Sequence, residues 1–167
     1  MIDVAFVGVD PGSSGAVAAI SRAGEVILLL KFKDTNETEV RRHFEVLRDM
    51  AEQANGALEK VHAMPKQGVS STFKFGASFG ALRAHLAWAD VRYDMPTPHQ
   101  WQTDLHCRTK GDKNITKDLA QRLFPDVRVT HAVADALLLA EWARRFGAWA
   151  IQPGGDHDDA DREHHEV

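Results

Sequence analysis

Three acidic residues, Asp10, Glu59 and Asp135, stand in sequence contexts where a carboxylate could do chemistry. Asp10 follows a run of apolar and β-branched residues typical of a buried strand, and the glycines after it mark a tight turn. A carboxylate at such a strand end has a desolvation cost that a cation could offset, and the glycines leave space for a phosphate to approach the backbone. The alternative interpretation is that Asp10 only caps the turn, since Asp-Pro-Gly alone is a weak signal.

Glu59 lies within an apolar segment that predicts a strand, and Asp135 lies within one that predicts a helix. His131 precedes Asp135 by four residues, so the two side chains share one face near the beginning of that helix. Each feature also has a simpler interpretation. Glu59 could be the solvent-facing member of an alternating strand, and the His131–Asp135 pair could be a local hydrogen bond or a surface pair.

The elements that must position these residues follow from hydrophobic periodicity and turn signals. A helix that begins after Asn36 or Thr38 is expected to reach residues 55–56, and a second helix, capped by Ser70 and Ser71, is expected to reach Trp88. Residues 65–68 are expected to form a loop. Strands are predicted at residues 3–9, 16–21, 25–32, 57–63 and 91–95, and further helices at residues 99–105, 113–124 and 130–146.

Three meandering strands followed by alternating helices and strands predict an α/β fold with a five-stranded mixed sheet and helices on both faces. A crossover through the first helix normally places the fourth strand beside the first and parallel to it. We therefore expect Asp10 and Glu59 to be near neighbours at one edge of the sheet.

The charge distribution separates a body from a tail. Residues 152–167 hold six acidic side chains against Arg162 alone, whereas residues 1–151 carry almost balanced charges. We expect one domain at residues 1–151 and an acidic, disordered tail at residues 152–167. Residues 60–89 contain basic side chains and no Asp or Glu, so they are the best candidate for contact with a polyanion, although a solvated basic face would look the same.

The sequence contains no apolar run of membrane-spanning length and no basic-then-apolar leader. Its single cysteine, Cys107, cannot form an internal disulfide. These features predict a soluble, cytoplasmic protein, in the host cytoplasm if a phage encodes it.

At the level of motifs, the chain resembles the phage branch of the RuvC-like Holliday-junction resolvases in the ribonuclease H superfamily. The resemblance rests on VGVDPGSSGAVA, ALEKVHAMPKQGVSSTFKFGASFG and HAVADALLLAEW, supported by PTPHQWQTDL and LAQRLFP, and it covers nearly all of residues 3–147. It implies a ribonuclease H-like fold and a homodimeric nuclease that uses two Mg²⁺ ions, or Mn²⁺, in each active site to hydrolyse branched DNA, leaving a 5′-phosphate and a 3′-hydroxyl.

Carried over by motif position, Asp10, Glu59, His131 and Asp135 are the expected catalytic and metal-binding residues. Many relatives have a further acid where this chain has Ala132, so His131 is expected to take over as a ligand or as the group that orients water. Lys66 stands where a small residue is expected, and an added cation there is compatible with phosphate contact.

Contacts to DNA are expected from two groups of residues. The first surrounds the loop after Glu59 and the start of the following helix, where backbone amides could receive phosphates. Phe73 could stack on unpaired bases, although its spacing from Phe79 and Leu82 also fits a helix core. The second group is a basic loop. The full set is Lys66, Gln67, Ser70, Ser71, Phe73, Lys74, Arg108, Lys110 and Lys113.

Two other function classes were considered. An actin-like or sugar-kinase-type ATPase shares the opening hairpin, but it needs a second domain that this chain is too short to supply. A non-cleaving protein that binds branched or single-stranded DNA could have the same fold. Three clustered acids facing DNA would be unfavourable in such a binding protein, so the nuclease is the preferred prediction.

Overall fold

The central strand β1 (Ile2–Asp10) is apolar along most of its length, and residues 4–9 are buried. In the computed structural model, which describes residues 1–33, 35–61 and 68–150, this strand lies in the middle of a five-stranded mixed sheet. It pairs antiparallel with β2 (Ala16–Ser21), and β2 pairs antiparallel with β3 (Val26–Lys31). On its other side β1 pairs parallel with β4 (Ala51–Leu58), followed by β5 (Val91–Asp94). The predicted sheet is confirmed, including the parallel placement of the fourth strand beside the first.

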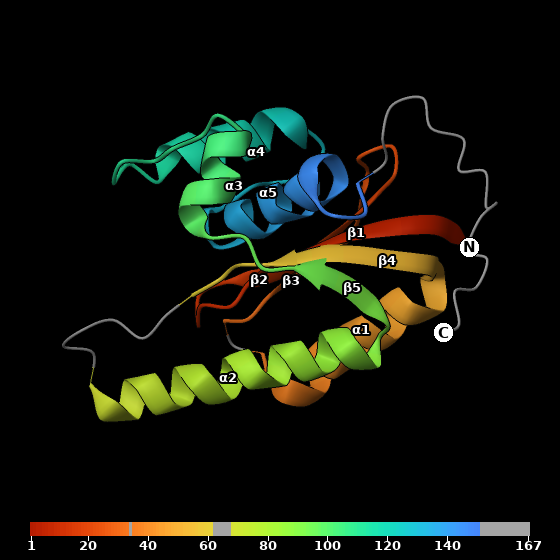
Figure 1. The fold of residues 1–167 in the computed structure, drawn as a ribbon, viewed down its shortest axis with the longest axis horizontal. Coiled ribbons are helices and arrows are strands. Elements are labelled where there is room, and N and C mark those ends of the chain that lie inside the picture. The colour runs from red at the N-terminus through yellow and green to blue at the C-terminus, as the bar shows by residue number, and fades with distance from the viewer. Residues whose placement is uncertain (34, 62–67, 151–167) are drawn as a thin grey trace, which may run out of the picture.

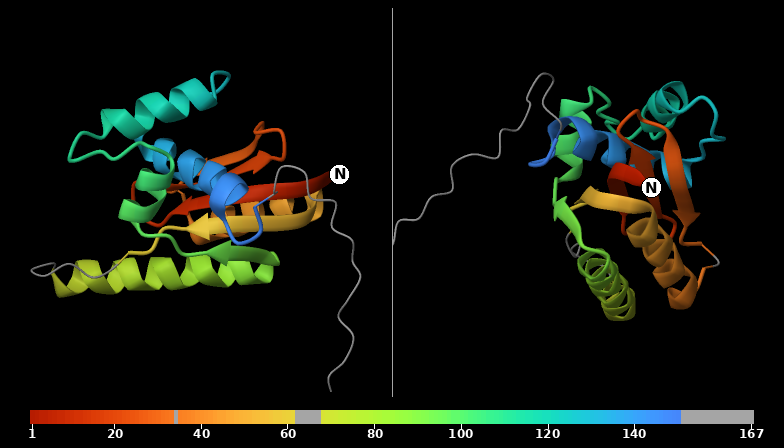
Figure 2. Two further views of the ribbon diagram at one scale, coloured as in Figure 1. Left: turned by 45° about the horizontal axis from the view of Figure 1, so that its top comes forward. Right: turned by 90° about the vertical axis from the view of Figure 1, so that its right-hand side faces the viewer.

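Helices cover both faces of this sheet, as predicted (Figures 1 and 2). One face carries α5 (His131–Phe146) with α3 (Pro98–Asp104) and α4 (Asn114–Leu123), and the other carries α1 (Glu37–Met50) and α2 (Val69–Trp88). Alternation along β1 divides the core between them, because successive side chains of a strand point to opposite faces. Val4 and Phe6 pack in the cluster with α5, whereas Ala5 and Val7 pack in the cluster with α1 and α2.

The contact between β1 and α5 is closest at Gly8. A Cβ atom on Gly8 would lie 2.0 Å from the carbonyl oxygen of Ala136 and 2.3 Å from the amide nitrogen of Ala140. The backbone of α5 therefore rests directly on β1, two residues before Asp10, and any side chain at position 8 would force the two elements apart.

Two predicted boundaries around the first crossover are wrong. The first helix ends at Met50 instead of residues 55–56, and β4 covers Ala51–Leu58 instead of residues 57–63. The sequence AEQA after Met50 consists of good helix formers, but pairing with β1 places these residues in an extended strand. Glu59 consequently follows the end of β4 and is not in its middle.

The helix beginnings give one confirmation and one correction. Asn36 caps α1 in a full capping box, in which its side chain accepts from the Glu39 amide and the Glu39 carboxylate accepts from the Asn36 amide. The second helix begins after Gly68, with no side-chain cap, so Ser70 and Ser71 lie inside its first turn instead of capping it. The other strands and helices begin and end within one or two residues of their predicted limits.

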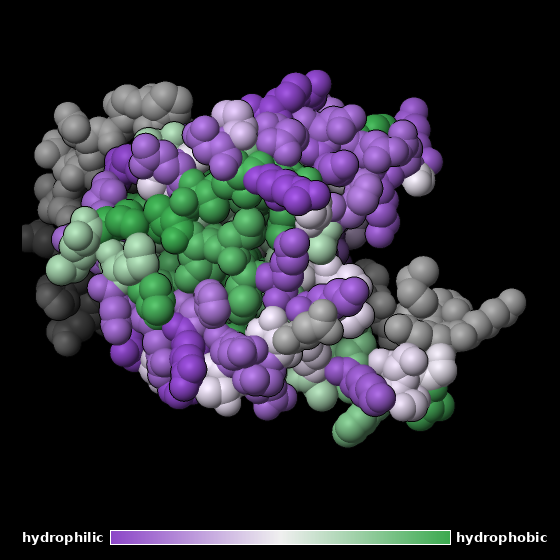
Figure 3. Space-filling model, turned by 180° about the vertical axis from the view of Figure 1, so that it is seen from behind, coloured by the Kyte–Doolittle hydropathy of each residue, from purple (hydrophilic) through white to green (hydrophobic). Residues whose placement is uncertain are grey.

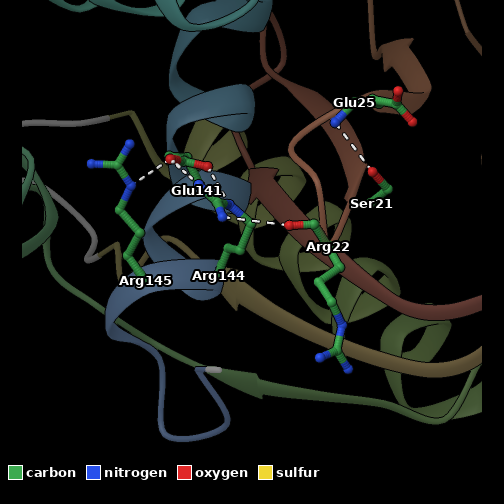
Figure 4. Close-up of polar contacts among 6 residues, drawn as sticks. All are labelled: Ser21, Arg22, Glu25, Glu141, Arg144 and Arg145. Carbon is green, nitrogen blue, oxygen red and sulfur yellow. Dashed lines mark hydrogen bonds and ion pairs between the residues drawn. The ribbon is translucent and has the colours of Figure 1, made fainter. Parts of the chain in front are cut away.

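A buried charge cluster fastens α5 to the β2–β3 turn (Figure 4). Glu141 is only 2% exposed and accepts two hydrogen bonds of 2.8 Å from Arg144, together with one from Arg145. Arg144 also donates to the carbonyl oxygen of Arg22 at 3.5 Å. The charge of Glu141 is therefore compensated inside the core, and one guanidinium links the helix to the hairpin.

The side of the molecule where β3 lies carries apolar surface in its middle (Figure 3). Within the described part of the chain, β3 is an edge strand of the sheet, and its apolar side chains are only partly covered, with Val26 and Leu29 on one face and Ile27 and Leu30 on the other. None of the helices in the described residues is both long enough and apolar enough to cross a membrane. The predicted tail and most of the predicted loop at residues 65–68 lie outside the described residues.

Candidate active site

Asp10 ends β1 on the face of the sheet covered by α5, the same face as Phe6 and Gly8. The turn that follows is folded back against it. A carboxylate oxygen of Asp10 accepts from the Gly12 amide at 3.2 Å, and a Cβ on Gly15 would lie 2.1 Å from the Asp10 carbonyl oxygen. Burial raises the pKa of Asp10, while the Gly12 amide and the charge of Lys113 act to lower it. Asp10 does cap its turn, but it does so as a largely buried carboxylate whose charge is costly.

Glu59 is held beside Asp10 by the parallel pairing of β1 and β4. The last paired residues are Val9 and Leu58, and the Glu59 amide then donates to the Val9 carbonyl oxygen at 3.0 Å. The carboxylate accepts a hydrogen bond of 2.9 Å from the indole Nε1 of Trp101. Burial raises the pKa of Glu59 to about 7, the Trp101 bond opposes this shift, and the charges of the two other acids add to it. The interpretation of Glu59 as a solvent-facing strand residue is wrong.

Asp135 reaches the same place from α5, which lies on β1 above Gly8. Its Oδ1 atom is buried and has no hydrogen-bond partner among the residues that the structure describes. Burial raises its pKa and the charge of Asp10 raises it further, whereas a hydrogen bond from Thr116 and the charges of Lys113 and His131 lower it. The charge of Asp10 thus acts on both other acids, and the charge of Asp135 also acts on Glu59.

Two further residues near the acids are His131 and Lys113. His131 is the exposed first residue of α5, one turn before Asp135. Lys113 precedes α4, and its charge lowers the pKa of Asp10, Glu59 and Asp135 alike. The sequence predicted Lys113 only as part of a basic loop for DNA, so its proximity to all three acids is a new finding.

Cys107 lies on the same side of the molecule but is no candidate nucleophile. It is buried, and burial together with the charge of Asp135 raises the pKa of its thiol to about 11. At neutral pH it is therefore a neutral thiol, which is a poor nucleophile and a poor metal ligand.

The donor set fits a hard divalent cation. Three carboxylates supply oxygen ligands of the kind that Mg²⁺ prefers, one buried oxygen is unsatisfied, and a cation would relieve the cost of ionising the buried acids. The candidate ligands do not form a compact metal site, because no three His, Cys, Asp or Glu side chains in the described ranges are gathered closely enough to hold one ion. The residue types fit the metal, and closing the ligand shell requires movement of side chains.

The residues predicted to contact DNA are mostly exposed where the structure describes them. Ser70, Ser71, Phe73 and Lys74 lie on the first turns of α2. The alternative interpretation of Phe73 as a residue of the helix core is wrong, because it is 76% exposed. One hollow is lined by residues of the Asp10 turn, Pro11 and Ser13, together with Ser71, Lys74, Phe75 and Ser78 of α2. The beginning of α2 therefore lies beside the turn that follows Asp10.

The second predicted group, Arg108, Lys110 and Lys113, is exposed between α3 and α4. Its backbone includes Lys110 and Gly111 in the left-handed region, with φ of +45° and +99°. Lys66 and Gln67 lie outside the described residues.

Two residues that lie at this site were not predicted from the sequence. Trp101 is completely buried yet bonds to Glu59, which is 42 residues away, and Thr116 is buried on α4 beside Asp135. Pro98 and Thr97 were sufficient to predict the short helix that carries Trp101. The partner of its indole depends on how that helix packs against the sheet edge, which local patterns do not encode.

Comparisons with known proteins establish the fold. No family model and no curated protein matches the chain. The structure is similar to RuvC of Thermus thermophilus, with a TM-score of 0.58 and 19% sequence identity, over 81% of this chain and 90% of that one. It is also similar to T. thermophilus RuvC in complex with a Holliday junction substrate, with a TM-score of 0.59 and 19% identity, over 86% of this chain and 97% of that one. The chain therefore has the predicted ribonuclease H-like fold.

Proposed function

We propose that this chain is a metal-dependent endodeoxyribonuclease that cleaves Holliday junctions and other branched DNA, as the phage-type sequence motifs imply. The observation that carries the proposal is the meeting of Asp10, Glu59 and Asp135 on one face of the sheet edge, from three separate elements. A stable fold has no need to collect three mutually repelling acids there, and their cost points to a function. The similarity to a RuvC structure that contains a Holliday junction suggests the substrate class.

In this proposal Asp10, Glu59 and Asp135, with His131, hold two Mg²⁺ ions, for which Mn²⁺ can substitute. Bound ions would activate the attacking water and neutralise the leaving oxygen of a phosphodiester, leaving a 5′-phosphate and a 3′-hydroxyl. The unsatisfied Oδ1 of Asp135 is one available ligand atom, and Glu59 retains one oxygen that Trp101 does not engage.

His131 is exposed at the beginning of α5, so its imidazole can accept a proton from a water molecule or orient that water molecule. The charge of Lys113 acts on the same three acids. Its ammonium partly balances their charge before DNA binds, and it can move to a phosphate when the acids are neutralised.

The proposed DNA surface combines the beginning of α2 with the loop between α3 and α4. Ser71, Phe73 and Lys74 line hollows beside the Asp10 turn, where a phosphate or an unpaired base could be received, and Ser70 precedes them on α2. Arg108, Lys110 and Lys113 would contact the backbone on the other side. Lys66 and Gln67 remain part of the proposal on the basis of sequence alone.

Cutting a four-way junction into two duplexes needs two symmetrical nicks, so we propose a homodimer. Two copies related by a two-fold axis would each present the same surface. The outer side of α2 is the candidate. Beyond the neighbouring backbone of the helix itself, no heavy atom of the described residues lies within 4 Å of where a Cβ of Gly76 or Gly80 would stand, so a second helix can approach closely.

The test is cleavage of labelled four-way junction, fork and linear duplex, with Mg²⁺, with Mn²⁺ and with a chelator. We expect metal-dependent cutting of the branched DNAs, with nicks that a DNA ligase can reseal because they carry a 5′-phosphate and a 3′-hydroxyl. Asp10→Asn is the matched inactive control. Tight junction binding without any cutting in either metal would overturn the proposal.

A second candidate function is a non-cleaving protein that binds branched or single-stranded DNA. One observation favours it: the described residues contain no three potential ligands already gathered for a metal ion. The same experiment separates the two, because a binding protein would hold the junction equally well with and without chelator.

A further inference from the structure

Two buried tryptophans in this fold donate their only polar hydrogen to a carboxylate, and both bonds involve α3. The indole Nε1 of Trp101, on α3, donates to Glu59 Oε1 at 2.9 Å. The indole Nε1 of Trp142, on α5, donates to Asp104 Oδ2 at the end of α3, at 2.7 Å. The first bond ends on a proposed catalytic acid, whereas the second lies outside the proposed site.

Trp101 is well suited to fix the position of another group. Its side chain is 0% exposed and lies in the apolar cluster under α5, with Leu105 and Val133. An indole N–H buried in such surroundings is costly if it has no acceptor, so the bond to Glu59 is strongly favoured. The ring itself cannot turn away, because close packing on all sides holds it in one rotamer.

The helix that carries Trp101 has a fixed beginning. Thr97 caps it by accepting from the Gln100 amide at 3.2 Å, and Pro98 supplies a preset first turn. Glu59 follows the last residue of β4, and its amide donates to the Val9 carbonyl oxygen at 3.0 Å, while the Lys60 amide donates to the Pro96 carbonyl oxygen at 2.8 Å. These bonds hold the backbone around Glu59, and the indole bond restricts the remaining freedom of its side chain.

We propose that Trp101 is a positioning residue that holds Glu59 in the orientation required to bind a divalent cation. Nothing in the sequence motifs or the comparisons assigns it this role, and the proposal rests on the proposed function. With Oε1 engaged by the indole, the carboxylate cannot rotate freely, and Trp101 leaves Oε2 free for a cation. Groups that orient a ligand in this way usually change metal affinity or activity by about 10–100-fold.

The first test follows the indole signals in a ¹⁵N-correlated NMR spectrum of the full chain without DNA. The four tryptophans give four indole N–H signals, and the Trp101→Phe and Trp142→Phe variants assign two of them. We expect Glu59→Ala to shift the Trp101 signal and leave the Trp142 signal in place. Titration with Mg²⁺ alone should move the Trp101 signal in wild type, again without moving that of Trp142.

The second test compares Trp101→Phe with Trp142→Phe, its matched control. Each change keeps an aromatic ring and removes one indole donor to one carboxylate. We expect Trp101→Phe to weaken Mg²⁺ binding, measured by calorimetry, and to lower kcat on a four-way junction, each by about 10–100-fold, without changing the junction Kd. Trp142→Phe should match wild type in all three measurements.

These outcomes separate the positioning role from the proposed nuclease activity. A Trp101 signal that moves with neither Glu59→Ala nor Mg²⁺ would refute the positioning role. If Trp101→Phe fails to fold, nuclear Overhauser contacts in the wild-type protein assign the Trp101 signal, and the same test applies. Equal Mg²⁺ affinity and equal kcat in the two phenylalanine variants would also refute it, while leaving the nuclease intact. Mg²⁺ binding that depends on Trp101, in a protein that cuts no DNA, would support the positioning role and refute the nuclease.

Discussion

Neutralising Glu59 should make the metal-free protein more stable, although the same change should abolish its proposed activity. Burial, together with the charges of Asp10 and Asp135, raises the pKa of Glu59 from 4.5 to about 7 in the folded state. A raised pKa means that the folded chain holds this proton more tightly than the unfolded chain does. The contribution of Glu59 to the free energy of unfolding is therefore lost as the pH rises from about 4.5 through 7. Glu59→Gln removes the charge but keeps an oxygen that can accept from Trp101.

The size of the effect follows from the shift. At 1.36 kcal/mol per pKa unit, the change from 4.5 to about 7 corresponds to roughly 3 kcal/mol, which is an upper bound because the side chain of Glu59 is partly exposed to screening water. We expect Glu59→Gln to gain about 1–3 kcal/mol at pH 8. For a domain of this size that raises Tm by about 3–10 °C. Below pH 4.5 the two proteins should have nearly equal Tm values, because wild-type Glu59 is then protonated in both states.

Thermal unfolding with a chelator present, followed by circular dichroism at several pH values between 4 and 8, measures this difference. Glu52→Gln is the matched control, because Glu52 lies exposed near the other end of β4. Adding Mg²⁺ at pH 8 should raise the Tm of wild type more than that of Glu59→Gln, since the ion replaces the proton in relieving the charge. An equal or lower Tm for Glu59→Gln at pH 8 would show that Glu59 is not a destabilised anion, and the electrostatic argument for the site would fail.

The remaining predictions concern activity and assembly. Replacing any of the three acids by its amide (Asp10→Asn, Glu59→Gln or Asp135→Asn) should abolish cleavage and should preserve or tighten junction binding, because a negative charge near phosphate is removed. A gel-shift assay run beside a cleavage assay measures both effects, and a variant that cuts at the wild-type rate would exclude its residue from the site. His131→Ala should slow single-turnover cleavage by about 10²-fold while His131→Asp retains metal-dependent activity, and unchanged kinetics would favour a local hydrogen bond. Gly80→Leu should weaken the dimer, as measured by sedimentation, and should change the main product from a cruciform plasmid from linear DNA to nicked circles. Paired nicks made by a monomeric protein would contradict the proposed dimer.

The meeting of Asp10 and Glu59 was predictable because it depends on topology. A crossover connection places the fourth strand beside the first with little dependence on side chains, so the two acids had to lie near one edge. The position of Glu59 relative to the end of its strand was not predictable to the same degree. Strand register is set by the pairing of Val9 with Leu58, and the helix-forming residues after Met50 gave the opposite local signal.

The surroundings of the acids depend on contacts between distant segments, which sequence patterns do not determine. Trp101 and Lys113 reach the acids only after α3 and α4 have folded over the sheet edge. Ser70 and Ser71 show the opposite limit, because their types favour a helix cap but the cap position is Gly68, two residues before Ser70. The three acids were predicted from the sequence and its family resemblance, and their catalytic role stays a prediction, whereas the groups around them were not predicted.

Packing between β1 and α5 offsets the unfavourable free energy of bringing these acids together. Gly8 lets the backbone of α5 lie directly on the strand, two residues from Asp10, and Asp135 is the residue just before Ala136, whose carbonyl oxygen makes that contact. Further along the helix, the buried side chains from Ala136 to Ala140 and the Glu141–Arg144 pair hold α5 in place. Repulsion between Asp10 and Asp135 therefore acts on two rigid backbones and cannot separate them without opening the core. Because the backbones cannot move apart, the repulsion remains between the charged side chains of Asp10 and Asp135. A proton or a divalent cation that binds these carboxylates relieves it.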